Sequence, residues 1–532
     1  MSTKRLRKII FWTVCWLVAA THAAKVLLIP RPVPNQVITF RILAHSLINL
    51  KGYDVFMILP FNYPYIASLT RSPIRLLTYP TEAGTGSFQS DEAFFEWMDK
   101  DVRDYYAADP HDYLQLCRDA LSLKSLEESV NREQFDLAII DGHPHFVCMY
   151  ALLYRASLKH ITYVDQNIEI LLSPKAIPTC TAAGGQELSF IHRLRNFWNG
   201  MFGGSIFSES DLLLREYITE KEQLTTEQLL AQSSFWLLNS NTILSGPSLY
   251  VQNMAETGGL TTWPSEKLSE DLEKFMNRPV LTEGVVVVSV GSDFENIPTV
   301  INDKLLEAFY LMKHPIVWEN RKVQEEDPRI RILDWIPQND LLGHEKTVLF
   351  VTDGNTNAQF EALYHGVPMI LVPLTPEQRC TADGIVNKGY AGIIDIKEMS
   401  SEEIAGNITS AITEGLYVQE MATASQIYRD NDNHPVKRAV FWIDHVMKHG
   451  CDHLQPSLQS SLYQYMMLDV VGFLFTVVFC VWNVVILCII FYCKGKKKGE
   501  NRSQSSTTRQ NGASKVNDKA TKTTKKPEQK DK

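Results

Sequence analysis

The sequence has 532 residues, 45% of them hydrophobic, and a net charge of −9 from 52 basic and 61 acidic residues. This length excludes a peptide or a small disulfide-stapled module, and it indicates about two to four domains. The charge is uneven, because residues 494–532 carry 13 Lys/Arg and 4 Asp/Glu and leave a net charge of −18 on the rest. An acidic body without a basic face argues against nucleic acid as a partner.

Residues 1–23 have the pattern of a secretory signal peptide. An apolar run, Ile9–Ala20, precedes small residues at a plausible cleavage site, Thr21–Ala23. The positive region before the run consists of Lys4, Arg5, Arg7 and Lys8. A retained anchor helix is the alternative, but the run is short for crossing a bilayer.

Residues 24–257 are predicted to form an N-terminal α/β domain. A helical pattern over Phe40–Lys51 separates two short apolar strands, and this β–α–β order predicts a parallel sheet. His45 falls inside this helix, where we expect its ring to pack. The predicted strands are Lys25–Pro30, Asp54–Pro60, Phe135–Asp141, His160–Val164 and Phe235–Asn239.

Residues 284–446 are predicted to form a second domain, after a linker of residues 258–283 that contains Gly258 and Gly259. The first strand, Gly284–Val290, is a near-continuous β-branched run, which is typical of a strand covered on both faces. The fold class is therefore α/β, with two doubly wound domains facing a cleft, and ligands of such sheets bind beyond the carboxyl ends of the strands. Further predicted elements are strands Pro315–Glu319, Ile330–Asp334, Val348–Asp353 and Met369–Val372, and helices Asn302–Met312 and Ala358–His365.

The run Val470–Cys493 has no charged residue and is long enough to span a bilayer as one C-terminal transmembrane helix. A buried core helix is the alternative. Residues 447–469 form the return and pre-membrane segment. Lysines follow the run directly, so the positive-inside rule places the tail, residues 494–532, in the cytosol and the body outside it. We expect the tail to be disordered beyond Gly499, with its lysines near membrane lipid.

The body contains few cysteines, and they lack metal-ligand spacing. They are Cys117, Cys148, Cys180, Cys380 and Cys451. We therefore expect neither a disulfide framework nor a bound metal. One sequon in the body begins at Asn407 and is a candidate for glycosylation.

The motifs with the most chemistry begin after the strand that ends at Asp334. Trp335 offers a flat face on which a planar ring can stack, and Gln338 can hydrogen-bond a base or a sugar. A tryptophan that only plugs the strand end is the alternative. The next strand is followed by a Gly/Asn turn and a helix, whose N-terminus can bind an anion; an ordinary capped helix is the alternative. The candidate residues of this second motif are Asp353, Gly354, Asn357 and Glu361.

Glu377 and Gln378 follow one more predicted strand. A neighbouring carboxylate and amide can hold vicinal sugar hydroxyls, whereas a simple polar turn is the alternative. Each of these motifs follows a separate strand of the same predicted sheet. Their side chains are therefore expected to converge at its carboxyl edge.

These motifs together resemble the signature of the UDP-glycosyltransferases, and most closely the membrane-bound animal UDP-glucuronosyltransferases. The resemblance extends over nearly the whole chain. Other matching segments are Val288–Ser292, Asn239–Ser240, Phe190–Asn196, His453–Pro456, Tyr463–Tyr465 and Leu468–Phe473. It implies the GT-B fold, a lumenal body in the endoplasmic reticulum membrane, an acceptor-binding first domain and a second domain that binds the UDP-sugar donor. The membrane span fits a lipophilic acceptor. No cofactor is expected, and no metal, because the sequence has no carboxylate cluster of the needed kind. The lysines after the span also suit a retrieval signal for the endoplasmic reticulum.

The resemblance also implies a role for each candidate residue in holding the UDP-sugar. Trp335 would stack on uracil, Gln338 would contact the nucleoside and Glu361 would hold the ribose hydroxyls. Ser292 and Asn357 would line the pyrophosphate. The donor sugar would be held by Glu377 and Gln378, where the family usually has Asp-Gln.

The phosphate turn departs from the family pattern. The family has histidine, glycine, glycine and later serine where this sequence has Asp353, Gly354, Asn355 and Ala358. A carboxylate beside a pyrophosphate is unfavourable, because like charges at about 4 Å repel by roughly 1 kcal/mol or more. Thr381, in place of a common asparagine, is a milder departure.

The family's general base is a histidine oriented by an aspartate, and only the aspartate has a clear match, Asp141. The histidine position falls on Val37, or on Gln36 after a one-residue shift, and neither can act as a base at neutral pH. His143 and His145, just beyond Asp141, are alternative bases. An enzyme restricted to acidic acceptors is a further alternative.

Two hypotheses of different classes follow from the sequence. The first is an enzyme that transfers glucuronic acid or glucose from UDP-sugar to a lipophilic acceptor with inversion. The second is a catalytically silent family member that binds nucleotide sugar or pairs with active relatives as a homo- or hetero-oligomer. A receptor or adhesion ectodomain would leave the nucleotide-site residues unexplained.

Overall fold

The computed structural model describes residues 23–63, 66–83, 90–100, 102–107, 113–165, 194, 205–246, 252–278, 284–292, 294, 297–324, 327–431, 433–454 and 467–510. It separates into two units, residues 1–455 and residues 456–532. The predicted signal peptide, apart from its last residue, and all of the segment at 190–196 except Leu194 lie outside the described residues.

The first half of the larger unit is built on a seven-stranded parallel sheet in the order β3-β2-β1-β4-β5-β6-β7. All five predicted strands are present, and the sheet also contains β3 and β7. The strands are β1 (Lys25–Ile29), β2 (Asp54–Pro60), β3 (Arg75–Tyr79), β4 (Leu137–Asp141), β5 (His160–Val164), β6 (Phe235–Leu238) and β7 (Met254–Glu256).

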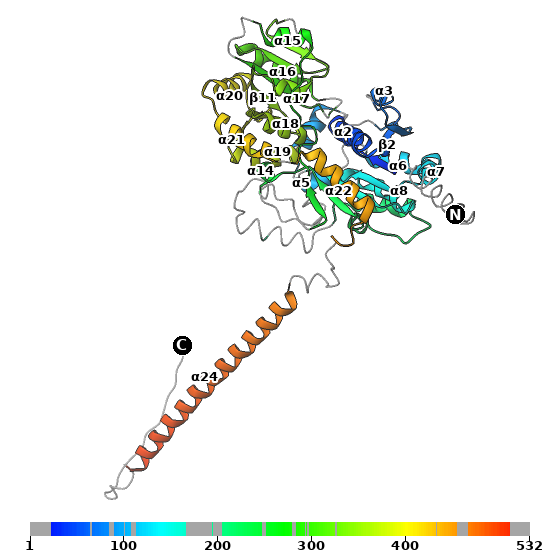
Figure 1. Cartoon of the computed structure of the whole chain (residues 1–532). Helices are drawn as coiled ribbons and strands as arrows, with labels where there is room; N and C mark the ends of the chain where they lie inside the picture. Colours follow the sequence, from blue (N-terminus) through cyan, green and yellow to red (C-terminus); the bar gives the residue numbers. More distant parts are fainter. Residues whose placement is uncertain are drawn as a thin grey trace, which may run out of the picture. The chain divides into compact units, whose positions relative to one another are not determined.

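Successive side chains along a strand of this sheet pack into different hydrophobic clusters, because they point alternately to the two faces of the sheet. In β1, Leu27 packs into one cluster and Leu28 into the other. Helices therefore cover both faces, and Figure 1 shows α2, α6 and α8 around the strands. The helices are α2 (Pro34–Lys51), α3 (Ile66–Leu69), α4 (Asp91–Met98), α5 (Val102–Ala107), α6 (Tyr113–Ser122), α7 (Lys124–Glu133), the 3-10 helix η1 (Pro144–Met149), α8 (Tyr150–Arg155), α12 (Ser208–Tyr217), α13 (Thr226–Ala231) and α14 (Thr242–Ser245).

Helix α2 begins six residues before the predicted start at Phe40. Pro34 occupies its first turn, where the missing proline N–H leaves no hydrogen bond unmade. Gly52 ends the helix in the left-handed conformation, with φ 69°. The early start brings Asn35, Gln36 and Val37 onto the first turn, beside the carboxyl edge of the sheet.

The second half contains a six-stranded parallel sheet in the order β10-β9-β8-β11-β12-β13. Figure 1 shows α16, α17 and α18 around β11. Its elements are α15 (Glu270–Met276), β8 (Val285–Ser289), α16 (Thr299–Leu311), β9 (Ile316–Glu319), β10 (Ile330–Leu333), α17 (Gln338–Leu342), β11 (Thr347–Thr352), α18 (Thr356–His365), β12 (Met369–Leu371), α19 (Pro376–Asn387), β13 (Ala391–Ile393), α20 (Ser401–Thr413) and α21 (Val418–Arg429). Two parallel α/β sheets were expected, and the structure confirms them.

Two segments pack differently from the expected division of the chain. Helix α15 lies within the predicted linker, yet its apolar residues Leu272 and Phe275 pack into the core of the second half. Helix α22 (Pro435–His449) packs against the first half, because Val440 and Ile443 join the core of the first sheet. The structural return to the first half therefore starts before residue 447.

The expectation of no disulfide framework is wrong for at least one pair of the described residues. Cys117 of α6 and Cys148 of η1 form a disulfide with 6.1 Å between their Cα atoms. Both side chains are buried in the core on one face of the first sheet. Sequence spacing did not indicate this pair, because their proximity depends on how α6 packs on η1.

The second unit contains helix α24 (Leu468–Gln510). Within it, Leu468–Lys494 is long and apolar enough to cross a membrane, with a mean hydropathy of 2.8. The helix continues beyond Gly499, so the expectation of disorder from that residue onward is wrong as far as Gln510. Residues 500–510 are mostly Ser, Thr and Asn, which disfavour helix, so the continuation is attributed to extension of an existing helix, which avoids the cost of nucleation.

Candidate functional site

Two cavities lie where the first turn of α2 meets the loops of the second sheet. The large cavity has a volume of about 450 Å³ and the small cavity about 100 Å³. Asn35 of α2 and Asn357 of α18 line both of them. The two cavities are therefore neighbours, joined at a contact between the two halves of the chain.

The large cavity brings together Ser292, Trp335, Gln338, Asn357 and Glu361. Trp335 follows β10, and its side chain is 59% exposed, so its ring does not plug the end of the strand. An exposed ring at the edge of a cavity is suited to stacking against a planar ligand.

Gln338 and Glu361 form a hydrogen-bonded pair in the large cavity. The amide Nε2 of Gln338 donates to Glu361 Oε2 over 2.8 Å. Burial removes water from the Glu361 carboxyl group and raises its pKa to about 7, although the bond from Gln338 opposes this shift. A hydroxyl-rich ligand that donates to this carboxylate would stabilise its ionised form.

The turn before α18 is organised by Asp353, which is fully buried. Its carboxylate accepts the backbone N–H groups of Gly291 and Asn355, each at 3.1 Å, and the side-chain amide of Asn355 at 3.1 Å. Asp353 does not line either cavity. The expected repulsion of a pyrophosphate is therefore offset by N–H donors that already surround the carboxylate.

Gly354 and Asn355 complete the turn. Gly354 has φ +79°, a conformation that strains other residues, and it lines the small cavity. The side chain of Asn355 caps α18 by accepting the N–H of Ala358 at 3.0 Å. Asn357 instead reaches the first half, where its Nδ2 donates to Asn35 O and to Thr39 Oγ1.

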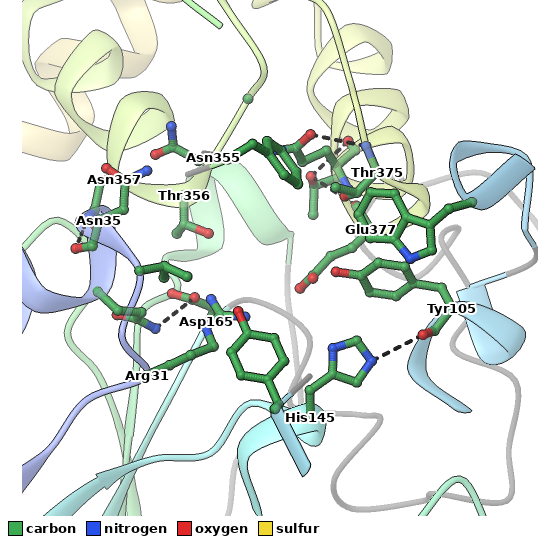
Figure 2. A pocket seen from close by; sticks show the side chains of 18 residues that line it. Arg31, Asn35, Tyr105, His145, Asp165, Asn355, Thr356, Asn357, Thr375 and Glu377 are labelled. Carbon is green, nitrogen blue, oxygen red and sulfur yellow. Dashed lines mark hydrogen bonds between the residues drawn. The ribbon is translucent and has the colours of Figure 1, made fainter. Parts of the chain in front are cut away.

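The small cavity is lined by charged and aromatic groups from both halves (Figure 2). Figure 2 shows Asp165 and Glu377 pointing into it from different walls, with His145 and Tyr105 along a third. Glu377 lies in the first turn of α19. Gln378 also lines the cavity, while its side chain completes a capping box with Thr375.

Four polar residues follow neighbouring strands at the carboxyl edge of the first sheet. Arg31 follows β1, Asp141 ends β4, Asp165 follows β5 and Asn239 follows β6. These strands lie side by side in the order β1-β4-β5-β6, so their ends meet along one edge. Arg31 and Asp165 were missed in the sequence, although they occupy the same kind of position as Asp141.

Asp141 is buried and acts through its neighbours. Its Oδ1 accepts the N–H of His143 at 2.9 Å, and its Oδ2 accepts the N–H of Arg31 at 3.3 Å. The Arg31 Nε lies 3.7 Å from the same carboxylate. Asp141 does not line the small cavity, but it holds Arg31, which does.

His143 faces the second half of the chain. Its Nδ1 accepts the N–H of His145 at 3.3 Å, which puts the ring proton of the neutral form on Nε2. That Nε2 lies 3.6 Å from Glu377 Oε2. Burial and the charge of Arg31 lower the pKa of His143. In this arrangement the ring presents a proton to Glu377 and has no lone pair directed at a substrate.

Gln36 and Val37 line different cavities. Val37 lines the large cavity, whereas Gln36 lines the small one. The Gln36 Nε2 donates to Asp165 Oδ2 over 3.0 Å, and Asn239 Nδ2 donates to Asp165 Oδ1 over 2.9 Å. Burial and the nearby charge of Asp141 raise the pKa of Asp165 to about 7.

Residues 24–503 match the family described as UDP-glucoronosyl and UDP-glucosyl transferase. The chain belongs to this family. It is 29% identical to UDP-glucuronosyltransferase 2B17 of Mus musculus over 493 residues, which cover 86% of this chain and 91% of the relative. It is 30% identical to UDP-glucuronosyltransferase 2C1 of Oryctolagus cuniculus, covering 73% of this chain and 80% of the relative.

Solved structures support the GT-B fold of this UDP-glycosyltransferase family member. One is Phytolacca americana UGT2 complexed with UDP-2fluoro-glucose and pterostilbene, with a TM-score of 0.56, 15% identity and coverage of 80% of this chain and 99% of that chain. Another is the glycotransferase of kitacinnamycin, with a TM-score of 0.54, 16% identity and coverage of 80% and 99%. At these identities the likeness concerns the fold alone.

Proposed function

We propose that this UDP-glycosyltransferase family enzyme transfers a hexosyl group, glucuronic acid or glucose, from a UDP-sugar to the hydroxyl group of a lipophilic acceptor. The observation that carries the proposal is the large cavity, in which an exposed tryptophan ring and a hydrogen-bonded Gln338–Glu361 pair lie together. A base needs a flat face on which to stack and a ribose needs acceptors for its hydroxyl groups, and this cavity offers both. The reaction proceeds with inversion at the anomeric carbon.

In this proposal the nucleoside occupies the large cavity. Trp335 stacks on uracil, Gln338 contacts the nucleoside and Glu361 accepts the ribose hydroxyls. Ser292 and Asn357 line the same cavity, and Asn357 contacts α2. They would line the diphosphate, together with the N-terminus of α18, where the helix dipole favours an anion.

The donor sugar would then reach the small cavity, which Asn357 connects to the large one. Glu377 and Gln378 would hold the sugar hydroxyls there. Asp353 supports this arrangement without touching the ligand, because its hydrogen bonds join the Gly291 turn to the α18 turn.

The candidate membrane helix supports a lipophilic acceptor and a membrane location for the enzyme. Helix α24 contains a 27-residue apolar stretch, Leu468–Lys494. We propose that it anchors the protein in the endoplasmic reticulum membrane with the body in the lumen and the basic tail in the cytosol. Acceptors that partition into lipid would then be concentrated beside the catalytic unit.

A second candidate function is a catalytically silent family member. It is favoured by Gln36 and Val37, which occupy the positions where the resemblance places the general base, since neither side chain takes a proton at neutral pH. Such a protein would bind nucleotide sugar or pair with active relatives in the membrane.

The first experiment is calorimetric titration of the full chain with UDP. Trp335→Ala should weaken binding roughly 10- to 100-fold, because stacking of a base on an aromatic side chain contributes about 1–3 kcal/mol. Trp335→Phe should retain most of the affinity. Phe441 is another exposed aromatic residue, outside both cavities, so Phe441→Ala is a control that should leave binding unchanged. Unaltered UDP affinity in Trp335→Ala would contradict the proposed site.

The second experiment separates the two candidate functions. UDP release from UDP-glucuronic acid or UDP-glucose is measured with a panel of phenols. Release that depends on the phenol supports the transferase, and detection of the phenyl glycoside identifies the product. UDP binding without release for any phenol would favour the silent protein.

A further inference from the structure

We propose that Asp165 is the general base of the transfer reaction, taking the proton from the acceptor hydroxyl in the small cavity. The inference rests on the proposed function. As the proton moves to the Asp165 carboxylate, the acceptor oxygen forms a bond to the anomeric carbon. The bond between that carbon and the UDP oxygen breaks, and its electron pair leaves with UDP. Atoms and charge balance without a further reactant.

The position of Asp165 fits this role. It follows β5 at the carboxyl edge of the first sheet, between the ends of β4 and β6. Its side chain lines the small cavity on the wall formed by the first half, while Glu377 enters from the second half (Figure 2). A sugar held by Glu377 would therefore lie between the diphosphate site and Asp165, and an inverting attack needs its base on the side away from UDP.

Two amide groups orient the Asp165 carboxylate. Gln36 Nε2 donates to one oxygen at 3.0 Å and Asn239 Nδ2 donates to the other at 2.9 Å. Both partners are neutral donors, so neither neutralises the charge that the base requires. Each carboxylate oxygen can accept more than one hydrogen bond, which leaves capacity for the acceptor hydroxyl. Gln36 thus orients a base, although it cannot be one.

The charges around Asp165 come from all the neighbouring elements. Arg31 after β1 favours the ionised form, whereas Asp141 of β4 and Glu377 of α19 disfavour it; Tyr163 of β5 is neutral. Desolvation and these carboxylates raise the pKa of Asp165 to about 7. A base with a pKa near the working pH combines sufficient ionised form with sufficient proton affinity. Asp165 is ionised, and able to accept a proton, above that pH.

Glu377, Arg31 and Asp141 are less suitable, and His145 is the rival base. His145 Nε2 donates its ring proton to the carbonyl oxygen of Tyr105 at 3.1 Å, so the lone pair of the ring lies on Nδ1; Asp165→Asn distinguishes the two residues, because it would leave a rate set by His145 unchanged. Glu377 faces the Nε2 of His143, and Arg31 is a cation. Asp141 does not line the cavity. Asp165 is therefore the carboxylate of the described first half that both reaches the cavity and carries only neutral hydrogen-bond partners.

The experiment compares three forms of the full chain: wild type, Asp165→Asn and the double variant Asp165→Asn/Asn239→Asp. In the double variant Gln36 can still donate to the oxygen of the introduced amide, and the N–H₂ of that amide can donate to the introduced carboxylate. That carboxylate would also keep the N–H of Gly259, which Asn239 Oδ1 accepts at 3.3 Å. The hydrogen-bond network is thus retained, but the negative charge moves away from the small cavity.

We expect both variants to bind UDP as the wild type does and to transfer sugar to 4-methylphenol about 10²- to 10⁴-fold more slowly. Transfer to 4-nitrophenol, whose hydroxyl group is far more acidic than that of 4-methylphenol and needs less help from a base, should fall much less. The rise of the wild-type rate through about pH 7 should be absent from both variants. Recovery of the rate in the double variant would show a structural role only and overturn the proposal, as would an unchanged pH profile in Asp165→Asn.

The outcomes also distinguish this inference from the proposed function. A wild-type protein that releases no UDP with any phenol would overturn both. A wild-type protein that transfers sugar, together with an Asp165→Asn variant of undiminished rate, would overturn the role of Asp165 alone.

Discussion

Glu361 illustrates how burial prepares a single residue for a ligand. The residue is 6% exposed, and burial raises the pKa of its carboxyl group to about 7, above the ordinary value of 4.5. The fold therefore disfavours the ionised form, and Glu361 reduces stability progressively as pH rises from about 4.5 through about 7. Hydroxyl donors from a ribose would reverse this preference, because they stabilise the charge.

This linkage predicts proton release when UDP binds. Between about pH 5.5 and 7.5 the affinity for UDP should rise with pH, and binding should release up to about one proton. Calorimetry in buffers of different ionisation enthalpy measures that proton. Glu361→Gln should bind without releasing it. Trp335→Ala is the matched control, since it should lower the affinity but keep the dependence on pH. Equal proton release by Glu361→Gln would contradict the assignment.

At the scale of the elements, the turn between β11 and α18 shows why a carboxylate is tolerated near an anion site. The sequence placed Asp353 beside the expected diphosphate, whereas the structure directs its oxygens at the Gly291 and Asn355 N–H groups. The strand ends at Thr352, so Asp353 is held between the neighbouring ends of β8 and β11. The carboxylate therefore stabilises two loops of the proposed nucleotide site.

Removing this carboxylate should destabilise the second half more than removing the helix cap. Asp353→Ala leaves buried N–H groups without their acceptor and should cost about 2–4 kcal/mol of unfolding free energy. Asn355→Ala should cost about 1 kcal/mol, mainly through the lost cap of α18. Denaturant unfolding compares the two variants. A smaller loss for Asp353→Ala than for Asn355→Ala would contradict this structural role of the carboxylate.

At the scale of the whole molecule, helix α22 follows the second half in the chain but packs against the first half. Asp444 accepts hydrogen bonds from Lys51 Nζ at 2.8 Å, from Lys448 Nζ at 2.8 Å and from the hydroxyl of Tyr53. Although burial opposes it, these bonds hold the pKa of Asp444 well below its ordinary value. The ionised group therefore stabilises the folded chain above the ordinary carboxyl pKa of about 4, and this contribution is lost as pH falls.

Asp444→Asn should accordingly lower the thermal stability at neutral pH and have a smaller effect in acid. The difference in Tm between wild type and variant should narrow as pH falls from about 5 toward about 2. Differential scanning calorimetry of both proteins over this range tests it. Asp452→Asn, which changes an exposed carboxyl group just beyond the end of α22, serves as the control. A pH-independent difference would argue against the ionic contribution of Asp444.

The separation into two units predicts that residues 1–455 fold without helix α24. A chain ending at residue 455 lacks the apolar stretch Leu468–Lys494 and should leave the membrane while binding UDP as the full chain does. Alkaline carbonate extraction of cell membranes, followed by UDP titration, measures both properties. Retention of the shortened chain in the carbonate-resistant pellet would show that another segment also anchors the protein.

Much of the fold and part of the site were predictable from local patterns. A continuous β-branched run such as Gly284–Val290 indicates a buried strand. The uncharged run Val470–Cys493 indicates a helix that can span a membrane. Both patterns can be read from residues that are neighbours in the sequence. Trp335, Gln338 and Glu361 were predicted as a group, since the ends of parallel strands meet at one edge. The sequence alone therefore determined the fold class, the family and the second-half wall of the site.

Tertiary structure decided which side chains from distant segments meet. Only packing brings Cys117 to Cys148, folds α22 back onto the first sheet, and turns the carboxylate of Asp353 away from the cavities. The strand order β1-β4-β5-β6 likewise sets Arg31 and Asp165 beside Asp141. Such contacts join residues far apart in the chain, and their energies depend on distance and burial in three dimensions, which no local pattern of residues encodes.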